Sequence, residues 1–133
     1  MLLLFSLLLL LIYSVPINGT AEEIIEQVRN ELLLNETSEP NSMVSFLCTI
    51  LPSPAFIKAT SDQDLISSIL DELGFGALGV RPDTWAAKYQ ADPNKRQSCF
   101  SAMYALATSE ISKTSVAGMK KLIRRCCLDD NEL

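Results

Sequence analysis

Four cysteines behind a leucine-rich leader constrain this chain more than any other feature, because two of them are adjacent. The cysteines all follow an apolar run at residues 2–15, and they are Cys48, Cys99, Cys126 and Cys127. An apolar run of this length is shorter than the ~20 residues that a transmembrane helix needs, and it is typical of a secretory signal peptide. The cysteines are therefore expected to oxidise in the secretory pathway and to hold a small fold together.

Small residues follow the apolar run, as signal peptidase requires. Gly19 and Ala21 occupy the third and first positions before a cut after Ala21, which is the preferred site, and a cut after Gly19 is the second choice. An uncleaved N-terminal anchor is the alternative. The sequence thus predicts a signal peptide over residues 1–21 and a single helical domain over residues 22–133, in which no second run reaches membrane-spanning length.

The adjacent cysteines limit how the disulfides can pair. Four cysteines allow three pairings, and a bridge between Cys126 and Cys127 would close a strained ring. Each of the two is therefore expected to reach back to Cys48 or to Cys99, in either order, and each bridge to add about 2–4 kcal/mol of stability. A metal site is the alternative use, but the chain has no Cys-x-x-Cys spacing and no histidine. We predict structural disulfides, with no metal and no other cofactor.

Apolar residues recur at helical spacing along most of the mature chain. Residues 42–51 are apolar on nearly all sides, which predicts a central and deeply buried helix. No segment alternates with a period of two, so strands are not expected. The sequence predicts an all-α fold, a small disulfide-stapled bundle of four to six short helices. The clearest single stripe lies within residues 61–74 and consists of Leu65, Ile66, Ile69, Leu70 and Leu73.

The ends of that helix carry recognisable capping residues. Ser61 and Asp64 resemble a capping box, with Asp in place of the usual Glu, and predict a helix that begins near Ser61. Gly74 suits a left-handed C-cap, and Gly76 and Gly79 are expected to continue a loop.

Charge is unevenly distributed along the chain, although its net value is −5. Residues 22–75 carry two basic residues against ten acidic ones, whereas residues 76–128 carry nine against three. On the last helix, basic residues form two rows at i, i+4 spacing. These rows predict a docking face for an acidic partner, either an extracellular protein or an acidic surface such as a glycosaminoglycan or a lipid headgroup. The alternative is a solvated face opposite Asp129, Asp130 and the acidic first half of the chain. Nucleic acid is not expected, because the net charge is negative and the compartment is wrong. The rows consist of Lys120, Lys121, Arg124 and Arg125.

Two short motifs concern the secretory pathway. Asn35 begins an Asn-Glu-Thr sequon in a predicted surface loop, so it is a predicted glycosylation site. Residues 130–133 share only the terminal Glu-Leu with luminal retrieval signals, so residence in the endoplasmic reticulum lumen is a minor alternative to secretion.

The chain lacks the usual groups of catalysis near neutral pH. It has no histidine, no Gly-x-Ser-x-Gly elbow and no glycine-rich phosphate loop, so it is not expected to be an enzyme. The preferred function is that of a small secreted interaction protein: an effector, a signal or a toxin-like ligand. The alternative is a carrier of a small apolar molecule in an internal helical cavity. Its predicted lining is Trp85, Tyr89, Phe100, Met103 and Met119.

Overall fold

The computed structural model describes residues 20–34, 39–62, 64–109 and 116–128. These residues form seven α-helices, one two-stranded sheet and a final π-helical turn, which confirms the predicted all-α class. The helices are more numerous than four to six because the chain restarts a separate short helix at Pro54.

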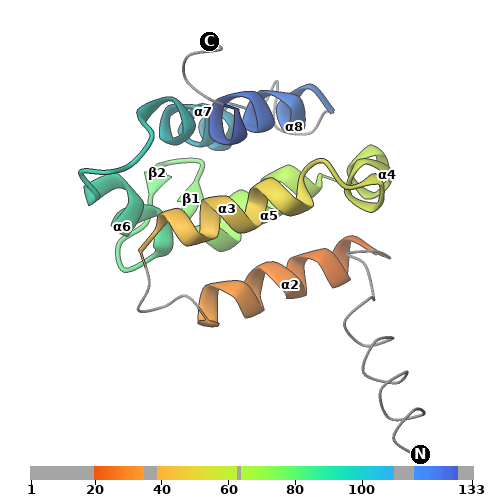
Figure 1. Ribbon diagram of the computed structural model, residues 1–133, viewed down its shortest axis with the longest axis horizontal. Helices are drawn as coiled ribbons and strands as arrows, with labels where there is room; N and C mark the ends of the chain where they lie inside the picture. Colours follow the sequence, from red (N-terminus) through yellow and green to blue (C-terminus); the bar gives the residue numbers. More distant parts are fainter. Residues whose placement is uncertain (1–19, 35–38, 63, 110–115, 129–133) are drawn as a thin grey trace, which may run out of the picture.

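The helices are arranged in three layers (Figure 1). One outer layer is α2, the middle layer holds α3 and α5, and the opposite outer layer holds α7 and α8. The small sheet and α6 lie at one end of these layers, and α4 lies at the other. In chain order the elements are α2 (Ala21–Leu34), α3 (Asn41–Ile50), α4 (Pro54–Asp62), α5 (Leu65–Leu73), β1 (Phe75–Gly76), β2 (Gly79–Val80), α6 (Trp85–Ala91), α7 (Gln97–Thr108), α8 (Val116–Leu122) and the π-helical turn η1 (Ile123–Cys127).

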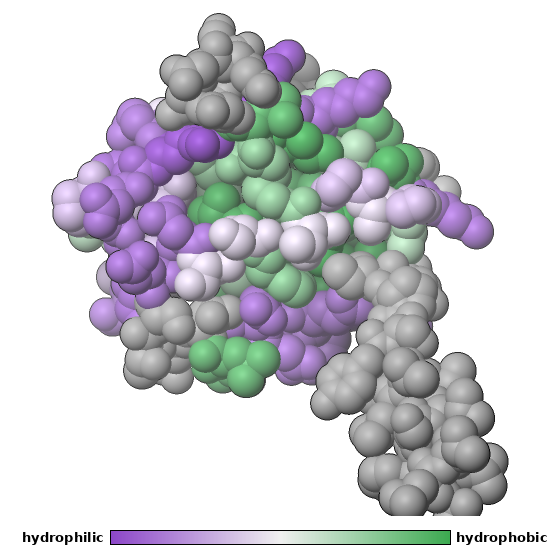
Figure 2. Space-filling model, viewed as in Figure 1, coloured by the Kyte–Doolittle hydropathy of each residue, from purple (hydrophilic) through white to green (hydrophobic). Residues whose placement is uncertain are grey.

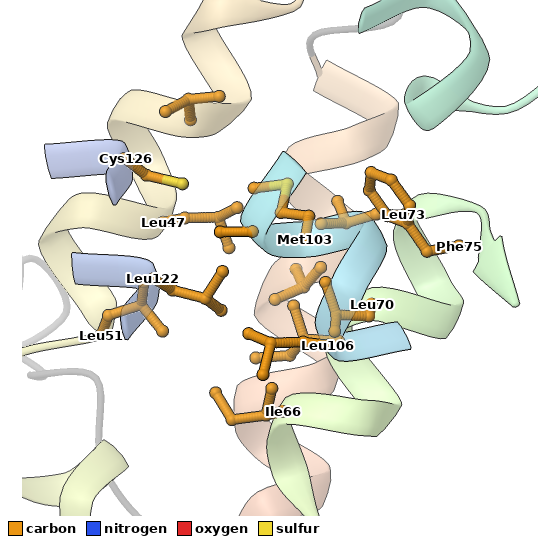
Figure 3. Close-up of a cluster of buried hydrophobic side chains, with 14 of the residues drawn as sticks. Leu47, Leu51, Ile66, Leu70, Leu73, Phe75, Met103, Leu106, Leu122 and Cys126 are labelled. Carbon is orange, nitrogen blue, oxygen red and sulfur yellow. The ribbon is translucent and has the colours of Figure 1, made fainter. Parts of the chain in front are cut away.

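The hydrophobic core lies where α5 meets its neighbours. The stripe predicted within residues 61–74 is buried throughout. Figure 3 shows its Ile66, Leu70 and Leu73 on the side of Met103 and Leu106 of α7. Leu47 of α3 and Leu122 of α8 approach the same cluster from the other side. Each such leucine contributes roughly 1.5–3 kcal/mol when it leaves water. The core therefore fixes α7 and α8 against the middle layer.

One face of α3 reaches the surface. Met43, Leu47 and Ile50 are buried, but Ser45 and Thr49 are exposed. The surface over α3 is accordingly pale to green in Figure 2, and purple surface gathers toward the edges of this view. The expectation of a helix buried on nearly all sides was too strong, because α3 lies at the outside of its layer.

No single helix in the described part of the chain has the length and apolar character to cross a bilayer. The segments Asn41–Ile50 and Pro54–Thr60 meet the criteria of length and composition only when taken together, across a bend of 85°.

The α5 helix begins later than its sequence suggests. The preceding helix α4 continues to Asp62, and the N-cap of α5 is Asp64, whose carboxylate accepts a hydrogen bond from the Ser67 N–H at 3.1 Å. Its other end is as predicted: Gly74 has φ of 113°, and its N–H donates to the carbonyls of Leu70 and Asp71. A side chain at Gly74 would collide with Thr84.

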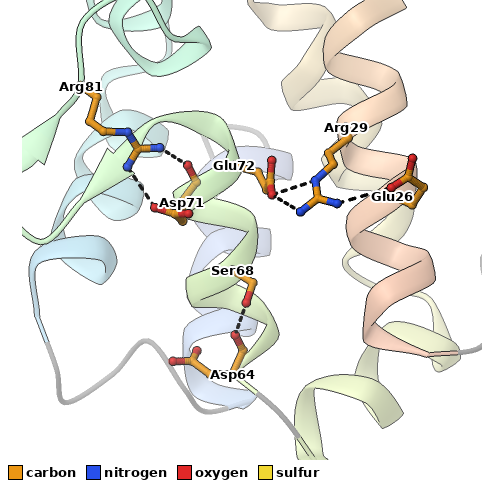
Figure 4. A network of polar contacts seen from close by, with 7 residues as sticks. All are labelled: Glu26, Arg29, Asp64, Ser68, Asp71, Glu72 and Arg81. Atoms are coloured by element: carbon orange, nitrogen blue, oxygen red, sulfur yellow. Dashed lines mark hydrogen bonds and ion pairs between the residues drawn. The ribbon is translucent and has the colours of Figure 1, made fainter.

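A short antiparallel hairpin follows Gly74 and was not expected. It pairs Phe75 with Val80 and Gly76 with Gly79. The pairing is too short to produce an alternating pattern in the sequence. Arg81 holds the hairpin to the end of α5 through an ion pair with Asp71 at 3.0 Å, as Figure 4 shows.

The first described helix starts at the predicted processing site. Thr20 precedes α2, and its hydroxyl oxygen accepts a hydrogen bond from the Glu23 N–H at 3.2 Å. Ala21 is only 9% exposed and belongs to the core. Residues 1–19 lie outside the described residues, so the leader stays a prediction, but a cut after Ala21 would remove both the cap and a core residue.

Candidate functional site

Two disulfides join the last turn of the described chain to two different helices. Cys48 of α3 pairs with Cys127, and Cys99 of α7 pairs with Cys126. The prediction that the adjacent cysteines each reach back is confirmed, and the structure supplies the order that the sequence left open. No cysteine is left as a free thiol.

The position of η1 explains how adjacent cysteines reach separate helices. Successive residues of a helix point roughly a quarter of a turn apart, so neighbours in sequence face different partners. Because η1 packs against both α3 and α7, one cysteine faces each helix. Cys126 is 6% exposed and lies beside Leu47 in Figure 3, whereas Cys127 is half-buried.

The basic residues predicted to bind a partner divide into two pairs. Lys120 and Arg124, the outer basic pair, are exposed, whereas Lys121 and Arg125, the inner basic pair, are half-buried. None of the four takes part in an ion pair with a carboxylate of the described residues. The reason is partly local, because α7, α8 and η1 contain neither aspartate nor glutamate.

The inner basic pair lines a groove between α7 and the α8–η1 segment. We call it the α7–η1 groove; its volume is about 310 Å³. Small side chains on α7 leave this space open beside the long basic side chains. The lining residues are Ser98, Ser101, Ala102, Ala105, Lys121 and Arg125.

Hydrogen bonds fix the groove and orient its hydroxyls. Ser98 Oγ donates to the carbonyl oxygen of Arg125 at 3.2 Å. Gln97 Nε2 donates to Ser101 Oγ at 3.1 Å, which leaves the hydroxyl proton of Ser101 for another acceptor. The Cys99–Cys126 disulfide lies one residue from both Ser98 and Arg125, so the two walls are also covalently joined.

A second hollow of about 310 Å³ lies between α2 and α5, and the one basic residue in its lining, Arg29, is already paired with Glu72. Arg29 contacts Glu72 through a hydrogen bond from Nε at 2.9 Å and an ion pair from Nη2 at 2.7 Å, and it also reaches Glu26 (Figure 4). The hydrogen bond and the charge of Glu72 raise the pKa of the Arg29 guanidinium above its ordinary value, with a smaller contribution from Glu26. This hollow therefore presents a satisfied ion pair.

The residues predicted to line an apolar cavity lie in or against the packed core. Trp85 stacks on Tyr89 with ring centroids 4.8 Å apart, and its indole N–H donates to the Pro40 carbonyl at 3.0 Å. Phe100 packs beside Tyr89 at 6.2 Å. Burial raises the pKa of the Tyr89 phenol. Met103 and Met119 are buried as well. Three hollows of the described residues, those between α2 and α5, between α7 and η1, and beside the hairpin, are lined by other side chains, and the carrier function stays a prediction.

Other predicted features fall outside the description. Asn35, Asp129 and Asp130, and the terminal tetrapeptide at 130–133, are not among the described residues. Across the parts of the chain that are described, no group of three or more His, Cys, Asp or Glu side chains is placed to hold a metal ion.

The serine and alanine wall of the groove was missed by the sequence reasoning. Its residues recur at i, i+3, i+4 and i+7 on α7, which places them on one helical face. This spacing was the available signal, but small residues carry little hydrophobic or charge contrast. The face consists of Ser98, Ser101, Ala102 and Ala105.

The fold and the disulfides define the class: a small all-α protein whose last turn is linked covalently to two helices. Comparison with protein-family models, with curated proteins and with solved structures found no match.

Proposed function

We propose that this chain is a small secreted interaction protein, without enzymatic activity, that binds an acidic extracellular partner through α8 and η1. The observation that carries the proposal is the α7–η1 groove, in which Lys121 and Arg125 face a wall without carboxylates. Removal of the leader and glycosylation of Asn35 belong to the same proposal. The two disulfides support it because such bridges persist in oxidising compartments.

Charge complementarity is the physical basis of the proposed binding. The outer and inner basic pairs place four cations within two turns of chain, and no acidic residue of α7, α8 or η1 neutralises them. A cluster of one sign attracts oppositely charged partners over about one Debye length, which is about 8 Å at physiological salt. The face is therefore suited to capture an anionic surface, and its affinity should fall as salt is raised.

The chemistry of the groove favours binding over catalysis. Its polar groups are two cations and two hydroxyls. A serine becomes a nucleophile when an adjacent base accepts its proton, and neither an imidazole nor a carboxylate lies in the lining. In their charged forms Lys121 and Arg125 are hydrogen-bond donors without an acceptor, which suits them to binding an anion.

The proposal is tested by expressing the full chain, with its own leader, in cells that secrete proteins. The protein should appear in the medium with its leader removed. It should then bind immobilised polyanions, tested separately as heparin and as polyglutamate. Lys121→Glu should elute at lower salt than Lys58→Glu, which makes the same charge change on the exposed face of α4. Equal elution of the two variants, or no retention on either polyanion, would contradict the proposal.

A further inference from the structure

We propose that the α7–η1 groove is a binding site for a sulfate group of a sulfated polysaccharide. The inference rests on the proposed function and names the class of partner for the same face. It is carried by the hydrogen-bond donors that the groove assembles and by the groove's small, covalently fixed shape.

The free polar groups of the groove are donors from two opposite walls. Lys121 supplies an ammonium and Arg125 a guanidinium from the α8–η1 side. Ser101 supplies a hydroxyl proton from α7, because its oxygen already accepts from Gln97 Nε2. The Ser98 hydroxyl already donates its proton to the Arg125 carbonyl, so Ser98 links the two walls of the groove and is not a free donor. Two cations and one free hydroxyl proton favour a ligand that is a negatively charged acceptor.

The number and placement of the donors match a sulfate ester better than a carboxylate. A sulfate ester presents three terminal oxygens in three directions, whereas a carboxylate presents two in one plane. Donors from two walls can each meet a separate sulfate oxygen, and hydrogen bonds to charged groups are the stronger ones. Ala102 and Ala105 line the same space with methyl groups only, so a volume of about 310 Å³ remains for the group and part of its sugar.

The surroundings favour a polysaccharide over a folded protein as the source of that sulfate. Stable protein interfaces are centred on large apolar or aromatic anchors, and the lining of the groove holds none. Lys120 and Arg124 instead extend the positive charge along the outside of the same segment for about 6 Å, or roughly one turn. A chain with repeated anionic groups can place one group in the groove and others against this outer pair.

The disulfide framework prepares the groove before the ligand arrives. Cys99 follows Ser98 on one wall, and Cys126 follows Arg125 on the other, so their bridge sets the spacing of the walls. A site that is already ordered loses less conformational entropy on binding, which favours affinity. This gives the Cys99–Cys126 bridge a role in binding in addition to its role in stability.

The test compares the two basic pairs by calorimetric titration with a heparin-derived hexasaccharide at fixed salt. The double variants Lys121→Gln/Arg125→Gln and Lys120→Gln/Arg124→Gln each remove two charges from the same segment. Loss of the inner pair should weaken binding about thirtyfold or more, because charge-assisted hydrogen bonds are lost, whereas loss of the outer pair should weaken it only about threefold. Circular dichroism and thermal unfolding would show that both variants remain folded.

Two further comparisons separate this inference from the broader proposal. Ser101→Ala should weaken hexasaccharide binding about threefold to tenfold without a change of charge. The matched control Ser45→Ala, at an exposed position of α3, should leave the affinity unchanged. An unsulfated hyaluronan hexasaccharide and a polyglutamate peptide should bind at least about tenfold more weakly than the heparin hexasaccharide. Equal losses of affinity in the inner-pair and outer-pair variants would overturn the groove site. The broader proposal, that α8 and η1 bind an acidic partner, would remain. Tighter binding of polyglutamate than of the heparin hexasaccharide would overturn the sulfated polysaccharide and indicate an acidic protein as the partner. No binding of any polyanion would overturn both proposals.

Discussion

Removing the two disulfides one at a time separates the stability of this fold from the shape of its groove. The Cys99–Cys126 bridge spans 27 residues. Its loss in a Cys99→Ala/Cys126→Ala variant should lower the free energy of unfolding by about 3.5 kcal/mol, because the unfolded chain regains the entropy that the bridge removed. The Cys48–Cys127 bridge spans 79 residues in sequence. With the other bridge intact, however, the loop it closes is only about 53 residues, which corresponds to about 4 kcal/mol.

Burial of the cysteines brings the stability losses of the two double variants closer together. Cys99 and Cys126 are buried, so replacing them with alanine also leaves a small cavity, which adds roughly 1 kcal/mol. Both double variants should therefore lose about 4 kcal/mol in urea unfolding. Stability is thus matched, and the affinity for the heparin hexasaccharide becomes the discriminating measurement.

Only one bridge joins the two walls of the groove. The Cys99→Ala/Cys126→Ala variant should bind the hexasaccharide about threefold to tenfold more weakly, because its walls are no longer held at a fixed spacing. The Cys48→Ala/Cys127→Ala variant should stay within about twofold of the parent chain, because α3 does not line the groove. Both affinities are measured by calorimetry well below the unfolding temperature of each variant. Equal affinities in the two variants would refute the assignment of groove geometry to the Cys99–Cys126 bridge.

Four further predictions concern the fold. In a chain that retains Thr20, Thr20→Ala should lower the free energy of unfolding by about 1 kcal/mol, because the Glu23 N–H loses its acceptor. For the same reason a chain that starts at Thr20 should melt at a higher temperature than one that starts at Glu22, and equal melting would contradict the capping role. Leu106→Ala should cost about 2–5 kcal/mol in urea unfolding, since this side chain is fully buried, and a loss under about 1 kcal/mol would show a looser core. Burial raises the pKa of Tyr89, so the unfolded chain loses that proton first and stability should fall as pH rises above about 10. A Tyr89→Phe variant should show a shallower decline in urea midpoints across that range, and an unchanged slope would exclude this cause.

Several parts of the fold could be predicted because their causes are local or covalent. The buried face of α5 follows from the helical spacing of its apolar residues. Gly74 ends that helix because its left-handed conformation suits glycine. The adjacent positions of Cys126 and Cys127 exclude a bridge between them, which leaves Cys48 and Cys99 as their partners.

Other parts depend on packing that one sequence does not reveal. The order of the bridges follows from the place of η1 between α3 and α7, and a π-helical turn has no clear sequence signature. Asp64 rather than Ser61 precedes α5, because α4 continues as a helix to Asp62. The basic residues were found from charge alone, but the groove also needs small residues on α7, which are brought opposite them only by folding.

The most direct measurement is disulfide mapping of the protein recovered from the medium of secreting cells. Partial reduction, with alkylation of each released cysteine before digestion, distinguishes the two pairings although Cys126 and Cys127 remain on one peptide. We predict that Cys48 is released together with Cys127 and Cys99 together with Cys126, with no thiol free at the start. The opposite pairing would contradict the arrangement of α3, α7 and η1. Protein found only inside cells with reduced cysteines would contradict the secreted, disulfide-linked state on which the proposed function depends.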